Sequence, residues 1–104
     1  MSNTTGGDNT ALGANTLWSN VSGNYNTAIG SHALEKSTVN ANTAVGYRSL
    51  AISTVGVSNT AIGYQTMTSN LSGSSNVALG YGALNLAVSA NNNTAIGHLA
   101  LAAA

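Results

Sequence analysis

The sequence has few charged residues and contains no cysteine, proline or phenylalanine. Only 4% of its 104 residues are charged, two basic and two acidic, so the formal net charge is zero. A typical soluble domain is about a quarter charged. Zero net charge gives no electrostatic attraction for nucleic acid or for an anionic membrane surface. We therefore expect no nucleic-acid partner. Without cysteine there is also no disulfide and no thiolate metal ligand.

Long hydrophobic segments are also missing. A membrane-spanning helix needs about 20 consecutive apolar residues, and no run in this sequence approaches that length. The opening MSNTTGGDNT has neither the basic start nor the apolar run of a signal peptide. We expect no membrane insertion. We also expect the chain to be either a segment of a longer protein or a protein that leaves its cell without a signal, as phage virion proteins do by lysis.

What the sequence does contain is a five-residue phrase that recurs six times. Three copies read NTAIG, and the others read NTALG, NTAVG and NVALG. The glycines that end the phrases are 17, 16, 17, 17 and 17 residues apart. This period indicates a single repeat domain over residues 1–104 rather than disorder, because a disordered chain needs no periodic apolar positions. The phrases begin at Asn9, Asn26, Asn42, Asn59, Asn76 and Asn93.

The residues after each phrase recur as well. The fourth residue after each glycine is a large aliphatic, a small residue precedes it, and most units then contain a Ser-Gly type of turn. The short second unit lacks one residue, near Asn40-Ala41. Helical repeats run to about 33 residues or more, whereas two short strands and two turns fill 17. The sequence therefore predicts an all-β protein, a parallel β-solenoid of about six coils stacked about 4.8 Å apart.

In such a stack each repeated residue lies next to its own copies. The phrase-initial asparagines can then form a ladder of amide hydrogen bonds from coil to coil. Tyr47, Tyr64 and Tyr81 each follow a phrase glycine. We expect their rings to stack in a short column, with the equivalent residues of the other coils, such as Ser31 and His98, at its ends.

The phrase also predicts association between chains. Strand alternation places the alanine on one face and the Thr and aliphatic residues on the other. Both alanine and aliphatic look buried, which is typical of a strand covered on two sides. One side is the coil's own core, and the other needs a partner, because a thin roll with so few charges would be poorly soluble alone. We predict a homo-oligomer of cyclic symmetry, whose seam and core contain Ile29, Val45, Ile62, Leu79 and Ile96.

The repeated phrases, followed by a small residue and leucine, resemble the head repeats of trimeric autotransporter adhesins, the YadA-like head. They resemble still more closely the NTAIGY-x-AL repeats of phage tail fibres. The resemblance extends from about Thr4 to Leu101. It implies a left-handed β-roll assembled as a homotrimer, located in a virion tail fibre or at an extracellular cell surface. It also implies host attachment, with a host glycan or protein as partner. The 17-residue units are longer than those of the autotransporter head, and no heptad, neck or anchor motif is present.

No set of residues indicates catalysis. His32 and His98 lie four coils apart, too far to share an ion within one chain, and no nucleophile, base and acid recur together. A three-fold axis could gather three copies of one histidine, although a surface or turn histidine is the simpler interpretation. The glycines of Gly80-Tyr81-Gly82 lack the Lys-Ser/Thr that follows in a phosphate loop. We predict no enzyme activity, no cofactor and no metal.

Two binding functions stay open beside a purely structural fibre. Thr recurs at the second phrase position in five of six units and would form a ladder like those of ice-binding solenoids, although Thr also simply favours strands. The exposed aromatics could stack on sugar rings, since they combine an apolar face with a polar edge, unless they pack against a neighbouring chain. The candidate carbohydrate-binding residues are Trp18, Tyr47, Tyr64 and Tyr81.

Overall fold

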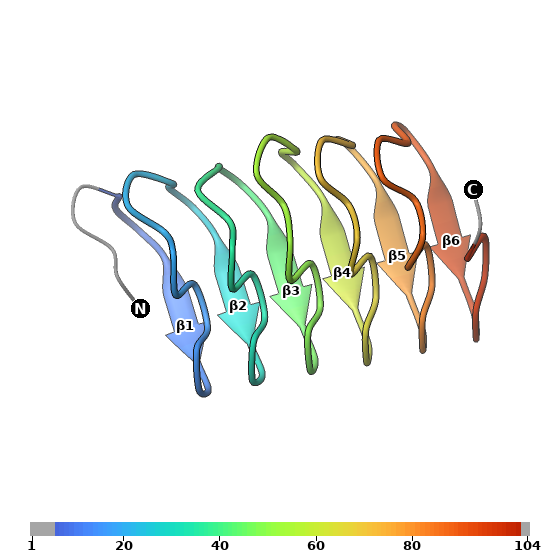
Figure 1. Ribbon diagram of the computed structural model, residues 1–104, viewed down its shortest axis with the longest axis horizontal. Coiled ribbons are helices and arrows are strands. Elements are labelled where there is room, and N and C mark those ends of the chain that lie inside the picture. The colour runs from blue at the N-terminus through green and yellow to red at the C-terminus, as the bar shows by residue number, and fades with distance from the viewer. Residues whose placement is uncertain (1–5, 103–104) are drawn as a thin grey trace.

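The computed structural model describes residues 6–102, which form an all-β solenoid of about five turns (Figure 1). The prediction of a parallel β-solenoid is confirmed. Six three-residue strands lie in chain order in one parallel sheet. The body measures 35 × 22 × 16 Å along its principal axes. The strands are β1 (Thr10–Leu12), β2 (Thr27–Ile29), β3 (Thr43–Val45), β4 (Thr60–Ile62), β5 (Val77–Leu79) and β6 (Thr94–Ile96). Below, coils 1 to 6 begin at the six phrase-initial asparagines.

Strand register is kept through the whole stack. Ala11 lies beside Ala28, and Ala28 beside Ala44, although the second unit is one residue shorter than the first. The missing residue precedes Val39, whose carbonyl takes the place of the glycine carbonyl found in other coils and accepts the Asn26 side-chain N–H at 2.6 Å. The shortening therefore lies in the turn just before Asn40, near the expected place, and the sheet is unaffected.

The core consists of two parallel columns. Strand alternation turns each central alanine inward, and Ala28, Ala44, Ala61 and Ala78 are fully buried. The aliphatic four residues after each phrase glycine packs against them. The small size of alanine lets the aliphatic column approach the sheet closely, as dense core packing requires, and residues 6–102 enclose no pocket. The fully buried members of this second column are Leu17, Leu34, Leu50, Met67 and Leu84.

The expected second strand does not form. The residues after each phrase glycine make a run of turns instead, six residues long in coils 1, 2, 4 and 5 and four residues long in coil 3, with positive φ at two positions. In coil 3 these are Arg48, with φ of 55°, and the buried Leu50, with φ of 48°. Residues with positive φ bend the chain sharply, so this segment folds inward rather than extending. It still bonds to its neighbours, since the Leu50 N–H donates to the Thr66 carbonyl at 2.9 Å.

The phrase glycine permits a close approach between coils. Gly63 has a φ of +133°, and a Cβ built on it would lie 2.8 Å from the Gly80 carbonyl oxygen. A side chain here would be strained by backbone conformation and would collide with the next coil. This explains why every unit ends its strand with glycine.

Within residues 6–102, no helix has the length and apolar character needed to cross a membrane.

Candidate functional site

The first feature with functional potential is the outward side of the sheet, here called the outer face. It consists of the side chains at the first and third positions of β1 to β6. Because alanine points inward, the aliphatic neighbours point outward, and Ile29 and Ile62 are 36% and 37% exposed. Leu79 is 44% exposed and Val45 is partly exposed. The predicted seam residues thus form one unbroken apolar column on the chain's surface, bordered by the Thr column.

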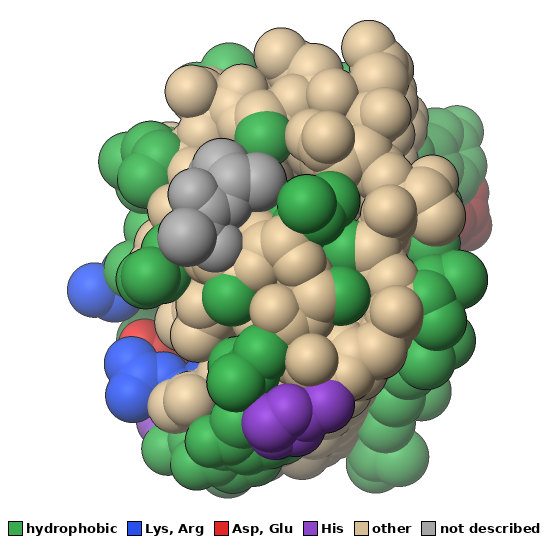
Figure 2. All heavy atoms as spheres, turned by 90° about the vertical axis from the view of Figure 1, so that its right-hand side faces the viewer, with side chains coloured by type: hydrophobic (Ala, Val, Ile, Leu, Met, Phe, Trp, Pro, Cys, Tyr) green, Lys and Arg blue, Asp and Glu red, His purple; other side chains and the backbone are tan. Residues whose placement is uncertain are grey.

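Apolar surface is also present elsewhere on the rod. Figure 2 looks along the stack from the β6 end and shows hydrophobic side chains on opposite sides of the rim, with few charged ones. A second aliphatic position lies eight residues after the phrase glycine, where Val21, Leu71 and Val88 are 48%, 42% and 48% exposed. This position lies outside the sheet. It therefore provides a comparison surface for any experiment on the outer face.

The phrase-initial asparagines hold the coils in register. The backbone N–H of Asn59 donates to Asn42 Oδ1 at 2.9 Å, and the N–H of Asn76 donates to Asn59 Oδ1 at 3.0 Å. The Asn59 Nδ2 group donates to the Gly73 carbonyl at 2.7 Å. The predicted asparagine ladder is present, but it runs mainly through side-chain to backbone bonds rather than from amide to amide. Its side chains are buried in coils 2 to 5, which makes them structural residues.

A second buried polar position was not predicted from the sequence. Seven residues after the phrase glycine, Asn20 and Asn70 are fully buried. Asn70 accepts the Gly73 N–H at 3.0 Å and donates to the Gly73 carbonyl at 2.9 Å. The signal for it is the Asn-x-x-Gly spacing shared by 20–23 and 70–73. In the short coil 2 the equivalent residue is Ser37, whose hydroxyl has no hydrogen-bond partner in the part of the chain that the structure describes.

The aromatic column forms as expected. Tyr47 and Tyr64 stack with ring centroids 5.3 Å apart, and Tyr64 and Tyr81 with centroids 5.2 Å apart and planes 4° apart. His98 continues the stack on Tyr81 at 5.1 Å. At the other end it is His32, not Ser31, that meets Tyr47, edge-on at 5.8 Å. The rings cover one another's faces, so the column offers a ligand mainly ring edges and hydroxyl groups.

Trp18 stands apart from this column. It lies in coil 1, is 54% exposed, and makes no ring contact with any other aromatic side chain among residues 6–102. Sugar stacking requires an exposed aromatic face, and the faces of the Tyr64 ring are covered by Tyr47 and Tyr81. The four candidate carbohydrate-binding residues therefore do not form one site within a single chain.

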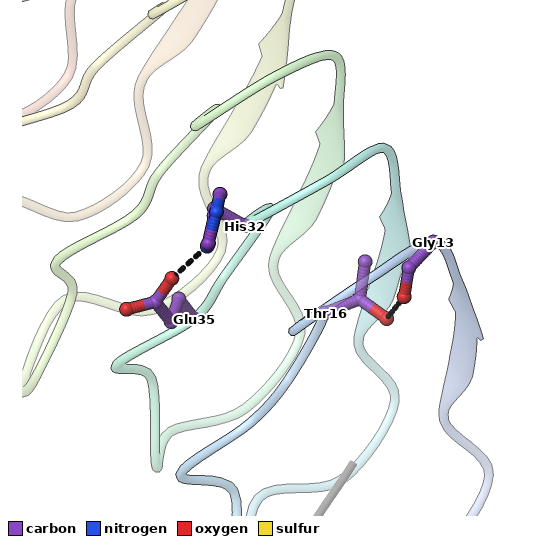
Figure 3. A network of polar contacts seen from close by, with 4 residues as sticks. All are labelled: Gly13, Thr16, His32 and Glu35. Carbon is purple, nitrogen blue, oxygen red and sulfur yellow. Dashed lines mark hydrogen bonds and ion pairs between the residues drawn. The ribbon is translucent and has the colours of Figure 1, made fainter.

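The few charged side chains form few electrostatic interactions. His32 Nδ1 contacts Glu35 Oε2 within coil 2, and Figure 3 shows this pair beside the bond from the Thr16 hydroxyl to the Gly13 carbonyl. Both His32 and Glu35 are about one third exposed, and such pairs contribute little to stability. Over residues 6–102 there is no group of three His, Asp or Glu side chains that could hold a metal ion, and no pocket.

Comparison of the chain with protein-family models, with curated proteins and with solved structures found no match. The features that bear on function are therefore those of the solenoid itself.

Proposed function

We propose that this chain is a segment of a rigid fibre, a homotrimer of left-handed β-rolls that serves host attachment in a phage tail fibre or a bacterial surface adhesin. The observation that carries the proposal is the outer face. A column of aliphatic side chains runs through all six strands, and it is exposed while the chain's own core is complete. Contiguous exposed apolar surface marks an interaction site, and identical chains meeting on it give a closed cyclic assembly.

The rod's construction suits a mechanical role. Every coil is joined to the next by backbone bonds along the strand and across the turns, such as Thr60 N–H to the Asn76 carbonyl at 2.8 Å and Met67 N–H to the Ala83 carbonyl at 2.9 Å. The register is kept through all five strand pairs of residues 6–102, which favours a stiff body. A body of this kind transmits force and holds a distal receptor-binding region at a set distance, which is what an attachment fibre requires.

The test is the mass in solution of the full chain and of two matched double variants. A trimer has about 31 kDa, three times the 10.3 kDa of the chain. Replacing Ile29 and Ile62 by Asp should give monomers that keep their β circular dichroism, because these side chains lie outside the core. Replacing Val21 and Leu71 by Asp introduces the same charges away from the sheet and should leave the trimer intact. A monomeric unmodified chain, or an unchanged Ile29/Ile62 variant, would refute the seam.

Ice binding is the second candidate function, and one observation favours it. The Thr and aliphatic columns both point outward, so Thr27, Thr43 and Thr60 are partly exposed in a regular array on the outer face. The same face cannot be both a trimer seam and an ice-binding surface. A thermal hysteresis measurement on the chain separates the two, because ice shaping requires this face to be open.

A further inference from the structure

The tyrosine column brings phenol side chains of successive coils together. Tyr47 and Tyr64 lie with ring centroids 5.3 Å apart and planes 20° apart, and the rings of Tyr64 and Tyr81 have centroids 5.2 Å apart and planes 4° apart. The three residues are 38%, 46% and 49% exposed in chain order. Each phenol is therefore open to a dissolved oxidant and has another phenol as its immediate neighbour.

Backbone bonds between the coils hold these neighbours in place. Gln65 N–H donates to the Tyr47 carbonyl at 2.8 Å, and Gly82 N–H donates to the Tyr64 carbonyl at 3.0 Å. The strands that precede the three tyrosines, β3, β4 and β5, are paired in register. The spacing between coils, about 4.8 Å, thus sets the spacing between rings, and a reaction between two neighbouring rings has its partners already assembled.

The fourth tyrosine of the sequence provides a contrast. Tyr25 is 67% exposed, but it makes no ring contact with another aromatic side chain among residues 6–102. Within the column, Tyr47 and Tyr81 lie two coils apart, about 10 Å at the strand spacing, with Tyr64 between them. Tyr64 is therefore the partner that both other column tyrosines require, whereas Tyr25 has none in its own chain.

We propose that the tyrosine column is a site of oxidative cross-linking, at which Tyr64 joins Tyr47 or Tyr81 as dityrosine and ties two coils together covalently. With a peroxidase and hydrogen peroxide as oxidant, each phenol gives up one electron and its hydroxyl proton. The two phenoxyl radicals form one carbon–carbon bond between ring carbons ortho to the oxygens. Each of these carbons then loses its hydrogen as a proton and each oxygen gains one, which restores both phenols. The two electrons and two protons given up reduce one peroxide molecule to two water molecules.

The link lies within one chain, so it does not depend on the proposed trimer. A covalent bond between coils restricts the unfolded chain in the way that a disulfide does, and this sequence has no cysteine with which to form a disulfide. Cross-linking therefore gives the rod a means of covalent reinforcement at the middle of the stack, in coils 3 to 5.

The experiment oxidises the full chain at low concentration with a peroxidase and hydrogen peroxide, and measures dityrosine by its fluorescence. Mass spectrometry after unfolding and tryptic digestion then locates the link. Trypsin cleaves after Lys36 and Arg48, which separates Tyr47 from the other two column tyrosines. A link from Tyr47 to Tyr64 joins two tryptic peptides, whereas a link from Tyr64 to Tyr81 leaves one peptide lighter by two hydrogen atoms. We expect these links in chains that still run at 10.3 kDa on a denaturing gel.

Tyrosine-to-phenylalanine variants test the pairing, because they keep a stacked ring and remove the hydroxyl group. Tyr64→Phe should lower the yield of dityrosine within the chain at least about tenfold, since the remaining column tyrosines are not neighbours. Tyr25→Phe is the matched control and should leave the yield unchanged. Tyr47→Phe should leave only the link within a single tryptic peptide. Circular dichroism of each variant checks that the solenoid has formed.

Three results would overturn the inference: no dityrosine in the oxidised chain, an unchanged yield in Tyr64→Phe, or links found only in bands at multiples of 10.3 kDa. The variant with Asp at Ile29 and Ile62 separates this inference from the proposed trimer. It should cross-link as well as the unmodified chain whether or not that chain is trimeric, and loss of the link in a folded monomer would also overturn the inference.

Discussion

Replacing Asn59 by alanine should destabilise the solenoid far more than the same change at Asn93, in the same ladder. Asn59 is fully buried and its side chain makes three hydrogen bonds. It donates to the Gly73 carbonyl at 2.7 Å, and its Oδ1 accepts both the backbone N–H of Asn76 at 3.0 Å and the Asn76 side-chain N–H at 3.1 Å. The alanine variant loses all three.

The magnitude depends on which partners find a substitute. The Gly73 carbonyl still accepts Asn70 Nδ2 at 2.9 Å, and Asn76 Nδ2 still donates to the Ala90 carbonyl at 2.7 Å. Only the buried Asn76 backbone N–H is left without an acceptor, which costs about 1–3 kcal/mol. With about 1 kcal/mol for the other bonds, the free energy of unfolding should fall by about 2–4 kcal/mol.

Asn93 provides the control because its Oδ1 accepts no hydrogen bond from residues 6–102. Its side chain only donates, to Asn76 Oδ1 at 3.3 Å and to the Asn91 carbonyl at 3.1 Å, at a partly exposed position. Asn93→Ala should cost about 1 kcal/mol or less. Urea unfolding followed by circular dichroism, at one low protomer concentration because association shifts apparent stability, measures both. Equal losses for the two variants would refute the argument that the ladder acts by satisfying backbone groups.

Three further predictions concern single positions, each measured by the same unfolding assay. Gly63→Ala should destabilise by more than about 2 kcal/mol through backbone strain and collision with the next coil, whereas Gly97→Ala, at a similar φ but in open space, should show the strain alone, about 1–2 kcal/mol. Leu50→Ala should cost about 2–5 kcal/mol because it empties a fully buried site, and Leu101→Ala, half exposed, about 1 kcal/mol. Ser37→Ala should raise stability by about 1 kcal/mol, since its buried hydroxyl has no partner within the described residues.

Each of these has an outcome that contradicts it. Equal costs at Gly63 and Gly97 would mean that contact between coils is loose at the phrase glycine. A cost at Leu101 matching that at Leu50 would mean that coil 6 is covered in solution. A loss of stability in Ser37→Ala would mean that the short coil 2 supplies its hydroxyl with an acceptor.

The periodic part of the fold was predictable from the sequence because the repeat states it directly. The spacing of the phrase glycines gives the coil length, and the Thr-Ala-Ile triplet gives the strand and its two faces. The inward alanine and outward isoleucine follow from strand geometry alone. The tyrosine column is predictable for the same reason, since Tyr47, Tyr64 and Tyr81 occupy one position of successive coils.

The segment after the phrase glycine was not predictable in this way. An Ala-Leu pair favours helix or strand, and leucine rarely adopts a positive φ, yet Leu34 and Leu50 do so here with φ of 49° and 48°. The tertiary requirement to bring the aliphatic side chain back over the alanine column outweighs the local preference. The residue at the other end of the tyrosine column was not predictable either. Ser31 was expected there, but His32, one position later and with a φ of 63°, contacts Tyr47 instead.

The uniform separation of the partners in the stack has a consequence for how such a rod is made and lengthened. Asn26 bonds to Asn9 over 17 residues and Asn42 to Asn26 over 16, and this separation is nearly constant from coil to coil. The chain entropy lost in closing each loop is therefore the same for the first coil and for the last, so folding can start anywhere and spread in equal steps. Duplication of one unit in the gene would insert a coil whose two faces already match those of its neighbours. Fibre length could then change without any new type of contact between coils.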